Sequence, residues 1–133
     1  MPANSPEQAH DFFVKYFNAG DLEGIVSLYE PDAILVKFPG PAVQGEAAIR
    51  EAMIEFLSIN GQMKLKIDRV FTTDDLALLF SSWTLRGTSA DGTPVVSSGQ
   101  TSDVVRRQAD GTWLFVIDNP HGAGAASPSG SQI

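Results

Sequence analysis

The feature that most constrains this chain is a predicted β-hairpin near its end, residues 99–121, with the sequence GQTSDVVRRQADGTWLFVIDNPH. A strand over Gly99–Gln108 and a strand over Thr112–Asp118 flank an Ala-Asp-Gly turn, a composition typical of hairpin connections. Both strands are rich in β-branched and aromatic residues. The chain is therefore expected to end in an antiparallel sheet.

Two carboxylates, Asp103 and Asp118, interrupt the apolar strands of this hairpin, and His121 follows it. Asp103 shares a strand face with Thr101 and Val105 by the two-residue period of strands. A carboxyl on an inward face would have a raised pKa and could act as a general acid, whereas the alternative is an ordinary surface carboxylate. For Asp118, the alternative is a turn role before Asn-Pro.

Three helices are expected before the sheet. Ser5 and Pro6 predict a helix start, and Gly20 predicts its end. Asp21 can cap a short second helix, and a third follows from Gly45. The first helix carries a stripe of aromatic and small residues that requires burial, and the second presents an apolar face; these are Ala9, Phe12, Phe13, Tyr16 and Phe17, and Leu22, Ile25, Val26 and Tyr29.

Four further segments are predicted to be strands: Asp32–Phe38, Met63–Thr72, Leu76–Arg86 and Pro94–Gln108, the last running into the hairpin. Helices followed by a run of long antiparallel strands indicate an α+β architecture. A curved sheet would have to wrap around the aromatic first helix to bury its stripe.

The last strand has two mainly apolar faces. By period two, Leu114, Val116 and Asp118 share the face expected to point inward, and Trp113, Phe115 and Ile117 share the other. Since the helices can cover only one face of the sheet, we expect the outer face to contact a second copy of the chain and form a homodimer.

Composition narrows the function classes. The formal net charge of −7 argues against nucleic-acid and anionic-membrane partners, because both bind preferentially to a basic surface patch. Without cysteine there is no disulfide and no thiolate metal site. No signal sequence and no apolar run of ~20 residues is present, so the expected location is the cytoplasm. A chain of 133 residues fits one domain, residues 1–121, followed by a flexible tail, residues 122–133.

Several motifs together resemble the NTF2-like superfamily, and within it the SnoaL-like and ketosteroid-isomerase-like proteins, including those of the DUF4440 type. The matching segments span about residues 6–121; they are Gly20-Asp21-Leu22, Tyr29-Glu30-Pro31-Asp32-Ala33, Gly45-Glu46-Ala47-Ala48-Ile49, and Asp103-Val104-Val105-Arg106-Arg107 through Asp110-Gly111-Thr112-Trp113. The resemblance implies a cone-shaped curved antiparallel sheet around N-terminal helices, a cystatin-like α+β barrel, that encloses an apolar cavity.

The resemblance also implies site residues. In the steroid isomerases, which serve as a standard example of pKa tuning, one aspartate removes a proton while a tyrosine and a protonated aspartate bind the oxyanion. Asp103 matches the oxyanion-hole aspartate, but Phe13 stands at the tyrosine position and Lys37 at the base position. Since two of the three groups are missing, that mechanism is not expected unless Tyr16 and Asp118 take over the missing roles. Asp103 and Asp118 are the candidate catalytic residues, and if they converge, one should be protonated and the other ionised.

Five residues are candidates for contact with a ligand: Tyr16, Trp83, Phe13, Val116 and His121. Trp83 would form a flat wall if it faces inward, and otherwise packs in the core or at a dimer face. His121 could be held by Asp118 or be an ordinary loop histidine. His10 lies off the face defined by Phe13 and Phe17 and is expected to be solvated. Lys37 could neutralise a buried carboxylate, but a solvated lysine is the more usual outcome.

Metal and nucleotide sites are not expected. The two histidines have no ligand-type spacing, and the glycines lack the context of a nucleotide-binding loop. The leading hypothesis is a cofactor-free acid–base isomerase or cyclase that binds a small apolar, cyclic or carbonyl-bearing molecule. The alternative is a non-catalytic dimeric module for ligand binding or protein association, in which side chains fill the cone.

Overall fold

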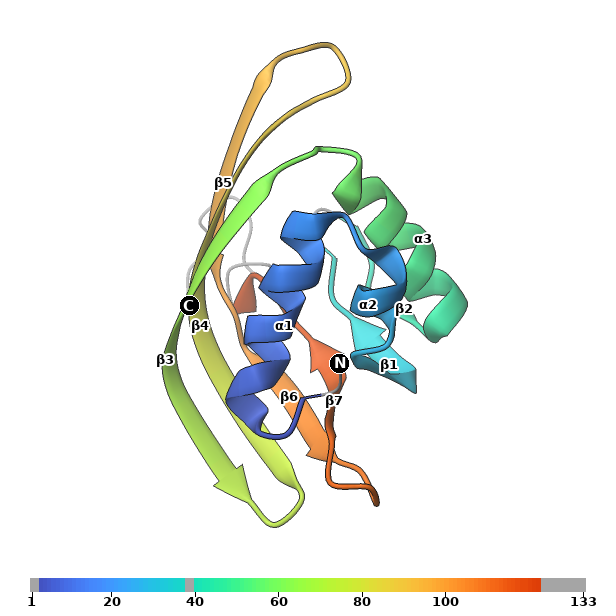
Figure 1. Ribbon diagram of the computed structural model, residues 1–133, viewed down its shortest axis with the longest axis vertical. Coiled ribbons are helices and arrows are strands. Elements are labelled where there is room, and N and C mark those ends of the chain that lie inside the picture. The colour runs from blue at the N-terminus through green and yellow to red at the C-terminus, as the bar shows by residue number, and fades with distance from the viewer. Residues whose placement is uncertain (1–2, 38–39, 123–133) are drawn as a thin grey trace.

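The computed structural model describes residues 3–37 and 40–122, in which three helices lie against the concave side of one seven-stranded sheet (Figure 1). The helices are α1 (Pro6–Ala19), α2 (Leu22–Val26) and α3 (Glu46–Leu57). The strands are β1 (Tyr29–Leu35), β2 (Val43–Gln44), β3 (Gln62–Thr73), β4 (Leu76–Thr88), β5 (Pro94–Gln100), β6 (Asp103–Arg107) and β7 (Trp113–Asp118).

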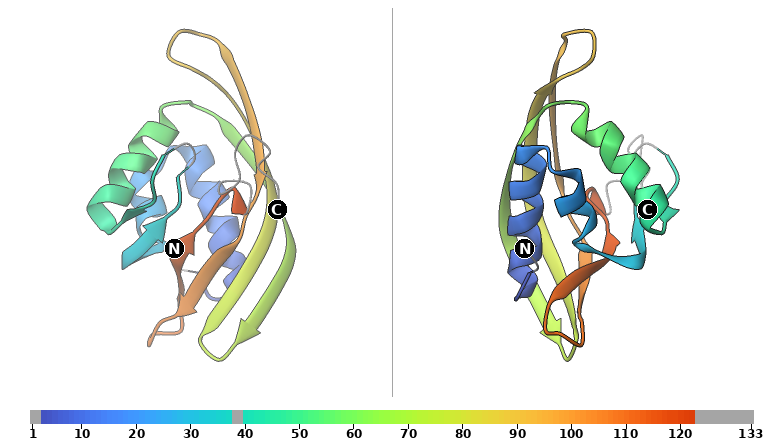
Figure 2. Two further views of the ribbon diagram at one scale, coloured as in Figure 1. Left: turned by 180° about the vertical axis from the view of Figure 1, so that it is seen from behind. Right: turned by 45° about the vertical axis from the view of Figure 1, so that its right-hand side comes forward.

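The sheet order is β2-β1-β7-β6-β4-β3, with β5 also paired to β4. Only the β1–β7 pair is parallel among these neighbours. The long strands β3 and β4 bend around α1, and the turn between β4 and β5 projects beyond the helices (Figures 1 and 2). The α+β class and the curved sheet around the first helix are as the sequence predicts.

The predicted start and end of the first helix and the predicted start of the second are confirmed. The Ser5 side chain accepts the Gln8 backbone N–H, and Gly20 ends α1 in the left-handed conformation with φ 70°. The Asp21 side chain caps α2 by accepting the Gly24 N–H at 2.9 Å. Within the described residues, no helix is both long and apolar enough to cross a membrane.

The predicted strand over Asp32–Phe38 is misplaced. The observed strand starts at Tyr29 and ends at Leu35, and Phe38 lies outside the described residues. Tyr29, expected on the apolar face of the second helix, is instead the first residue of β1, because that helix already ends at Val26. Leu28 O then accepts the Phe115 N–H at 2.7 Å, which attaches this segment to the sheet.

The predicted long strand over Pro94–Gln108 is two strands, separated at Thr101 and Ser102. The cause is a change of partner along β4, whose Ser82–Thr88 half pairs with β5 and whose Leu76–Leu79 half pairs with β6. The expected flexible tail, residues 122–133, lies outside the described residues except for Gly122.

The face assignment in β7 is wrong for most of that strand. Val104 pairs with Ile117, but Val105 pairs with Phe115, so Val116 is an extra residue in a β-bulge. Trp113 and Phe115 are buried in the core rather than on an outer face. Because the bulge inserts one residue, Asp118 joins their face and is buried as expected.

The two sides of β7 can be distinguished by mutation. Trp113 is buried and Leu114 is half-buried, so Trp113→Ala should lower the free energy of unfolding by about 3–5 kcal/mol. Leu114→Ala should cost much less, on the order of 1 kcal/mol. Denaturant unfolding of both variants measures this, and equal losses would contradict the observed orientation of the strand.

Candidate functional site

An open cavity of about 350 Å³ lies between the helices and the concave side of the sheet. Its walls are mostly apolar, and its polar lining includes both hairpin aspartates, the two histidines and Thr101, with Lys37 and Glu55 as further charged residues. The apolar lining is Phe13, Leu35, Val36, Ala52, Met53, Phe56, Ile59, Met63, Leu65, Trp83, Phe115 and Pro120. The cone is therefore hollow rather than filled by its own side chains.

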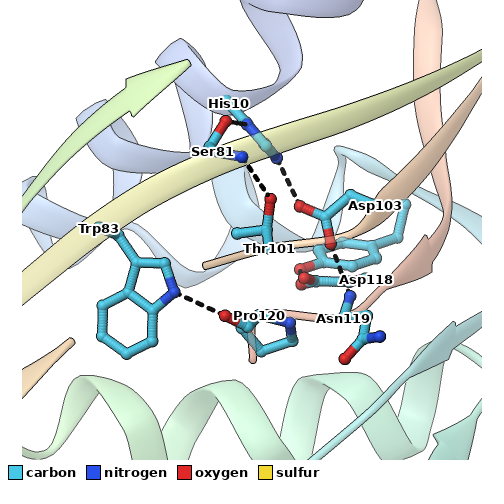
Figure 3. Close-up of polar contacts among 9 residues, drawn as sticks. His10, Ser81, Trp83, Thr101, Asp103, Asp118, Asn119 and Pro120 are labelled. Atoms are coloured by element: carbon cyan, nitrogen blue, oxygen red, sulfur yellow. Dashed lines mark hydrogen bonds and ion pairs between the residues drawn. The ribbon is translucent and has the colours of Figure 1, made fainter. Parts of the chain in front are cut away.

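Asp103 stands at the start of β6, with 1% of its surface exposed. Both of its carboxylate oxygens accept hydrogen bonds: Oδ1 accepts the Asn119 backbone N–H at 2.6 Å, and Oδ2 contacts His10 Nε2 at 2.5 Å. Figure 3 shows these groups converging from different elements. Fixed donors thus occupy both oxygens of Asp103.

His10 lies in α1 and is buried, with 2% of its surface exposed, so the expectation that it is solvated is wrong. Its Nδ1 is 2.7 Å from Ser81 Oγ, and its ring stacks on Phe115. The sequence did contain the signal: His10, Phe13 and Phe17 follow the i, i+3, i+7 spacing of a single helix face.

The hydrogen bonds of Ser81 determine the His10 tautomer. Ser81 is fully buried, and its hydroxyl has no other partner within residues 3–37 and 40–122. If His10 were an imidazolium, both ring nitrogens would donate and the Ser81 O–H would be left unpaired, at a cost of about 1–3 kcal/mol. The neutral ring, accepting the Ser81 proton at Nδ1 and donating Nε2–H to Asp103, satisfies all three groups.

Asp118 ends β7 beside Asp103 and is also buried (Figure 3). Burial in the apolar cone, reinforced by the charge of Asp103, raises the pKa of Asp118 well above its usual value. The Tyr29 hydroxyl donates to Asp118 Oδ2. Burial raises the pKa of Tyr29 as well, so this hydroxyl keeps its proton.

The two aspartates therefore differ in environment. Asp103 is held by N–H donors from Asn119 and His10, which suit a carboxylate, whereas burial and the charge of Asp103 favour the protonated form of Asp118. Two adjacent carboxyls in a low-dielectric site share a proton in this way. Ser81, His10 and Tyr29 were not among the candidates from sequence, since their roles depend on partners far along the chain.

The five candidates for ligand contact are placed differently. Phe13, Trp83 and His121 line the cavity, and Lys37, expected to be solvated, lines it too. Tyr16 packs in the core against Phe12 and is outside the cavity lining. Val116 is the bulged residue of β7 and also lies outside that lining.

Within the part of the chain that the structure describes, no group of three or more histidine or acidic side chains is arranged to hold a metal ion. The polar groups at the base of the cavity instead bond to one another.

The pKa of Asp118 gives a prediction for stability. Neutral Asp118 contributes stability that is fully present below the unfolded pKa, near 3.8, and is lost as pH rises toward the raised folded pKa. Asp118→Asn cannot ionise. Above about pH 4, the free energy of unfolding of the wild type should therefore fall relative to this variant, by up to about 1.4 kcal/mol per pH unit while only the unfolded chain is ionised.

Denaturant unfolding at a series of pH values tests this, with Asp110→Asn as the matched control. Asp110 is an exposed turn carboxylate whose pKa is lowered by hydrogen bonds from Thr112. Its contribution is complete above the ordinary aspartate range, so the free energy of unfolding of the wild type relative to Asp110→Asn should not change with pH above about pH 5. Parallel curves for wild type and Asp118→Asn would contradict the raised pKa.

Comparison with known proteins supports the fold. A similar solved structure is that of a ketosteroid isomerase-like protein from Erwinia carotovora atroseptica, with 24% sequence identity over 84% of this chain and 88% of that one and a TM-score of 0.75. An NTF-2 like protein of unknown function from Shewanella oneidensis is also similar, with 18% identity over 84% of this chain and 92% of that one and a TM-score of 0.70. A Catenulispora acidiphila protein in complex with S-DNPA has 22% identity over 84% of this chain and 86% of that one and a TM-score of 0.66.

No curated protein sequence matches the chain. The model of the SnoaL-like domain matches residues 9–116, which include most of α1 and most of the sheet and end before Asp118 and His121. The DUF4440 subtype is not among these findings, but the resemblance to the NTF2-like and SnoaL-like proteins is confirmed. The chain belongs to the SnoaL-like domain family.

Proposed function

We propose that this protein binds a compact apolar molecule bearing a carbonyl group, and that the Asp118 and Asp103 pair promotes proton transfer on it without a cofactor. The observation that carries the proposal is the pair of buried carboxyls in the lining of a mostly apolar, open cavity. This arrangement suits an isomerase or cyclase, whose substrate must be held dry while protons move.

Cavity size and lining define the ligand class. A volume of about 350 Å³ lies at the low end of small-molecule sites, which favours one or two rings over a larger skeleton. Phe13, Phe56, Phe115 and Trp83 line the walls with flat apolar surfaces suited to a ring. The similar Catenulispora acidiphila structure also contains a ligand, S-DNPA, which supports small-molecule binding for this chain.

Asp118 is the proposed hydrogen-bond donor and acid. Its proton would lie near a carbonyl oxygen at the base of the cavity and would stabilise negative charge as an enolate forms. Tyr29 donates to the other side of this carboxyl, which holds it in place. Asp103 is the ionised neighbour that keeps Asp118 protonated.

The proposed site differs from that of the steroid isomerases. Their first-helix tyrosine is replaced by Phe13, and the hydroxyl beside the acid comes from Tyr29 in β1. Asp103 matches their oxyanion-hole aspartate in sequence, but here its two oxygens are taken by His10 and Asn119. The donor role passes to Asp118 in this proposal.

A bicyclic ketone, 1-tetralone, tests binding and chemistry separately. A ligand that binds only the folded protein should raise the Tm in a concentration-dependent manner. The enzyme should also exchange the protons next to the carbonyl in D₂O, measured by NMR above the protein-free rate. Asp118→Asn should still bind, because it keeps a hydrogen-bond donor, but should lose about 100-fold or more in exchange.

Asp103→Asn should also reduce exchange, because removing the fixed negative charge changes the protonation of Asp118. Asp110→Asn, a carboxylate outside the cavity lining, is the control and should retain both activities. Unchanged exchange in both cavity variants would remove the catalytic proposal, and no change in Tm with any cyclic ketone would remove the binding proposal.

A second candidate function, a dimeric binding or association module, is favoured by the convex side of the sheet. Register places apolar side chains together there: Phe71 pairs with Leu78, Leu78 with Val104, and Val104 with Ile117. Phe71 is 48% exposed and packs edge-on against Phe80. We propose that a second copy covers this face, since an exposed apolar patch of this kind typically marks an interface.

Sedimentation velocity at micromolar concentration tests the homodimer. The wild type should sediment as a dimer, and Phe71→Asp should shift it to monomer because a charge would be buried at the interface. Since Phe71 is already half exposed, the variant should remain folded, as circular dichroism can verify. A monomeric wild type would rule the homodimer out.

A further inference from the structure

The chain turns back across the cavity after β7, in a segment of four residues, Asn119–Gly122, here called the strap. Hydrogen bonds fix it at several points: Asn119 N–H donates to Asp103 at 2.6 Å, and Asn119 O accepts from Ser102 N at 3.0 Å. The Trp83 indole N–H donates to Pro120 O at 2.7 Å (Figure 3). The strap is therefore held at a set position over the junction of β5 and β6.

Two glycines allow this close approach. A Cβ at Gly99 would lie 2.9 Å from the Trp83 ring and 3.0 Å from Pro120 O. A Cβ at Gly122 would lie 2.9 Å from Gln100 O, and its φ of +54° also favours glycine. Both contacts are shorter than side-chain carbons tolerate, so the strap can lie this close only because neither position carries a side chain.

The result of this arrangement is the placement of His121. Its ring meets the Trp83 ring edge-on, with centroids 5.4 Å apart and planes at 74°. Both residues line the same cavity as Asp118. The strap therefore holds the partly buried imidazole of His121, which can act as a base, in the same cavity as the carboxyl of Asp118, which is the proposed acid.

The proposed reaction needs a group that removes a proton from carbon, and the other candidates are poorly suited. Asp103 already accepts a fixed donor at each oxygen, and the ring nitrogens of His10 are committed to Ser81 and Asp103. Lys37 and Glu55 also line the cavity. A lysine amine ordinarily carries its proton at neutral pH, and Glu55 is largely exposed, where a carboxylate is a weak base.

We infer that His121 is the catalytic base of this site, an inference that rests on the proposed function. An imidazole nitrogen of His121 takes the proton next to the carbonyl, and the C–H electron pair becomes the new C=C bond. The carbonyl π pair moves to oxygen, which takes the proton of Asp118. The products are an enol, imidazolium and the Asp118 carboxylate, and return of a proton to carbon completes exchange or isomerisation.

The electrostatics of the strap fit this role. Burial lowers the pKa of His121, so the imidazole is neutral and able to accept a proton at neutral pH. The charged and titratable groups that share the cavity with it are Lys37, Glu55, His10, Asp103 and Asp118. General acid–base catalysis requires a group that can accept a proton and a group that can donate one at the same pH, and His121 and Asp118 would supply these two groups in one cavity.

The inference is tested by measuring how fast the His121→Ala variant exchanges the protons next to the carbonyl of 1-tetralone in D₂O. The variant should bind the ketone with a similar shift in Tm but exchange its protons about 100-fold or more slowly. Added imidazole should restore exchange in proportion to its free-base concentration, which a purely structural role for His121 would not produce. The wild-type rate should fall at acidic pH as His121 is protonated, and the variant should lose this limb.

Three outcomes overturn the inference. Undiminished exchange in His121→Ala would do so, as would a loss that imidazole fails to restore. The third is binding without any exchange by the wild type, which leaves the ligand-binding proposal in place. A companion variant, Lys37→Gln, identifies the alternative base if it alone loses exchange. Absence of any ketone-dependent Tm shift in the wild type would instead show that the proposed function itself is wrong.

Discussion

The extra residue in β7 is the constraint on which the site depends. Because Val116 is bulged, Phe115 and Asp118 both face the cavity although they are three positions apart in the strand. Without the bulge, a strand that buries Trp113 and Phe115 would turn Asp118 to the convex side of the sheet. The bulge therefore allows one short strand to supply core packing over most of its length and a functional carboxyl at its end.

Within residues 3–37 and 40–122, neither buried carboxyl forms an ion pair with an arginine or a lysine. Arg50, Arg106 and Arg107 form their ion pairs elsewhere, with Glu23, Glu30 and Asp75 respectively. Asp103 relies on a backbone N–H and a neutral histidine, and Asp118 on its own proton and the Tyr29 hydroxyl. Hydrogen-bond donors of the protein itself thus stabilise the buried carboxyls, and no separate counter-ion has to occupy the cavity. This explains how a polar cluster can persist at the base of an apolar cavity.

The sequence predicted much of the framework because those signals are local. The Ser5, Gly20 and Asp21 caps act within one turn of their own helix, and the aromatic stripe of α1 is defined by helical period alone. Asp103 was also found, through the strand period and the resemblance to the steroid isomerases. Its position on an inward face agrees with its burial in the structure.

The errors concern residues whose environment is set by distant segments. Tyr29 fits the periodicity of the second helix, but its pairing with Phe115 of β7 makes it part of a strand. His10 was assigned to solvent although its spacing from Phe13 fits the buried face, because a polar side chain gives no indication of partners such as Ser81, 71 residues away. The strap at His121 likewise depends on contacts with Trp83 and Gly99 that only folding creates.

By itself, the sequence determined the helices, the positions of most strands along the chain, the curved α+β architecture and the presence of two carboxylates in apolar strands. Only the tertiary structure decided that both carboxyls meet, that His10 and Tyr29 join them, and that His121 lies over the same cavity. The physical reason is range. Caps and periodicity act over a few residues, whereas strand register, bulges and buried hydrogen bonds join side chains far apart in the chain, and their energies depend on the burial that folding produces.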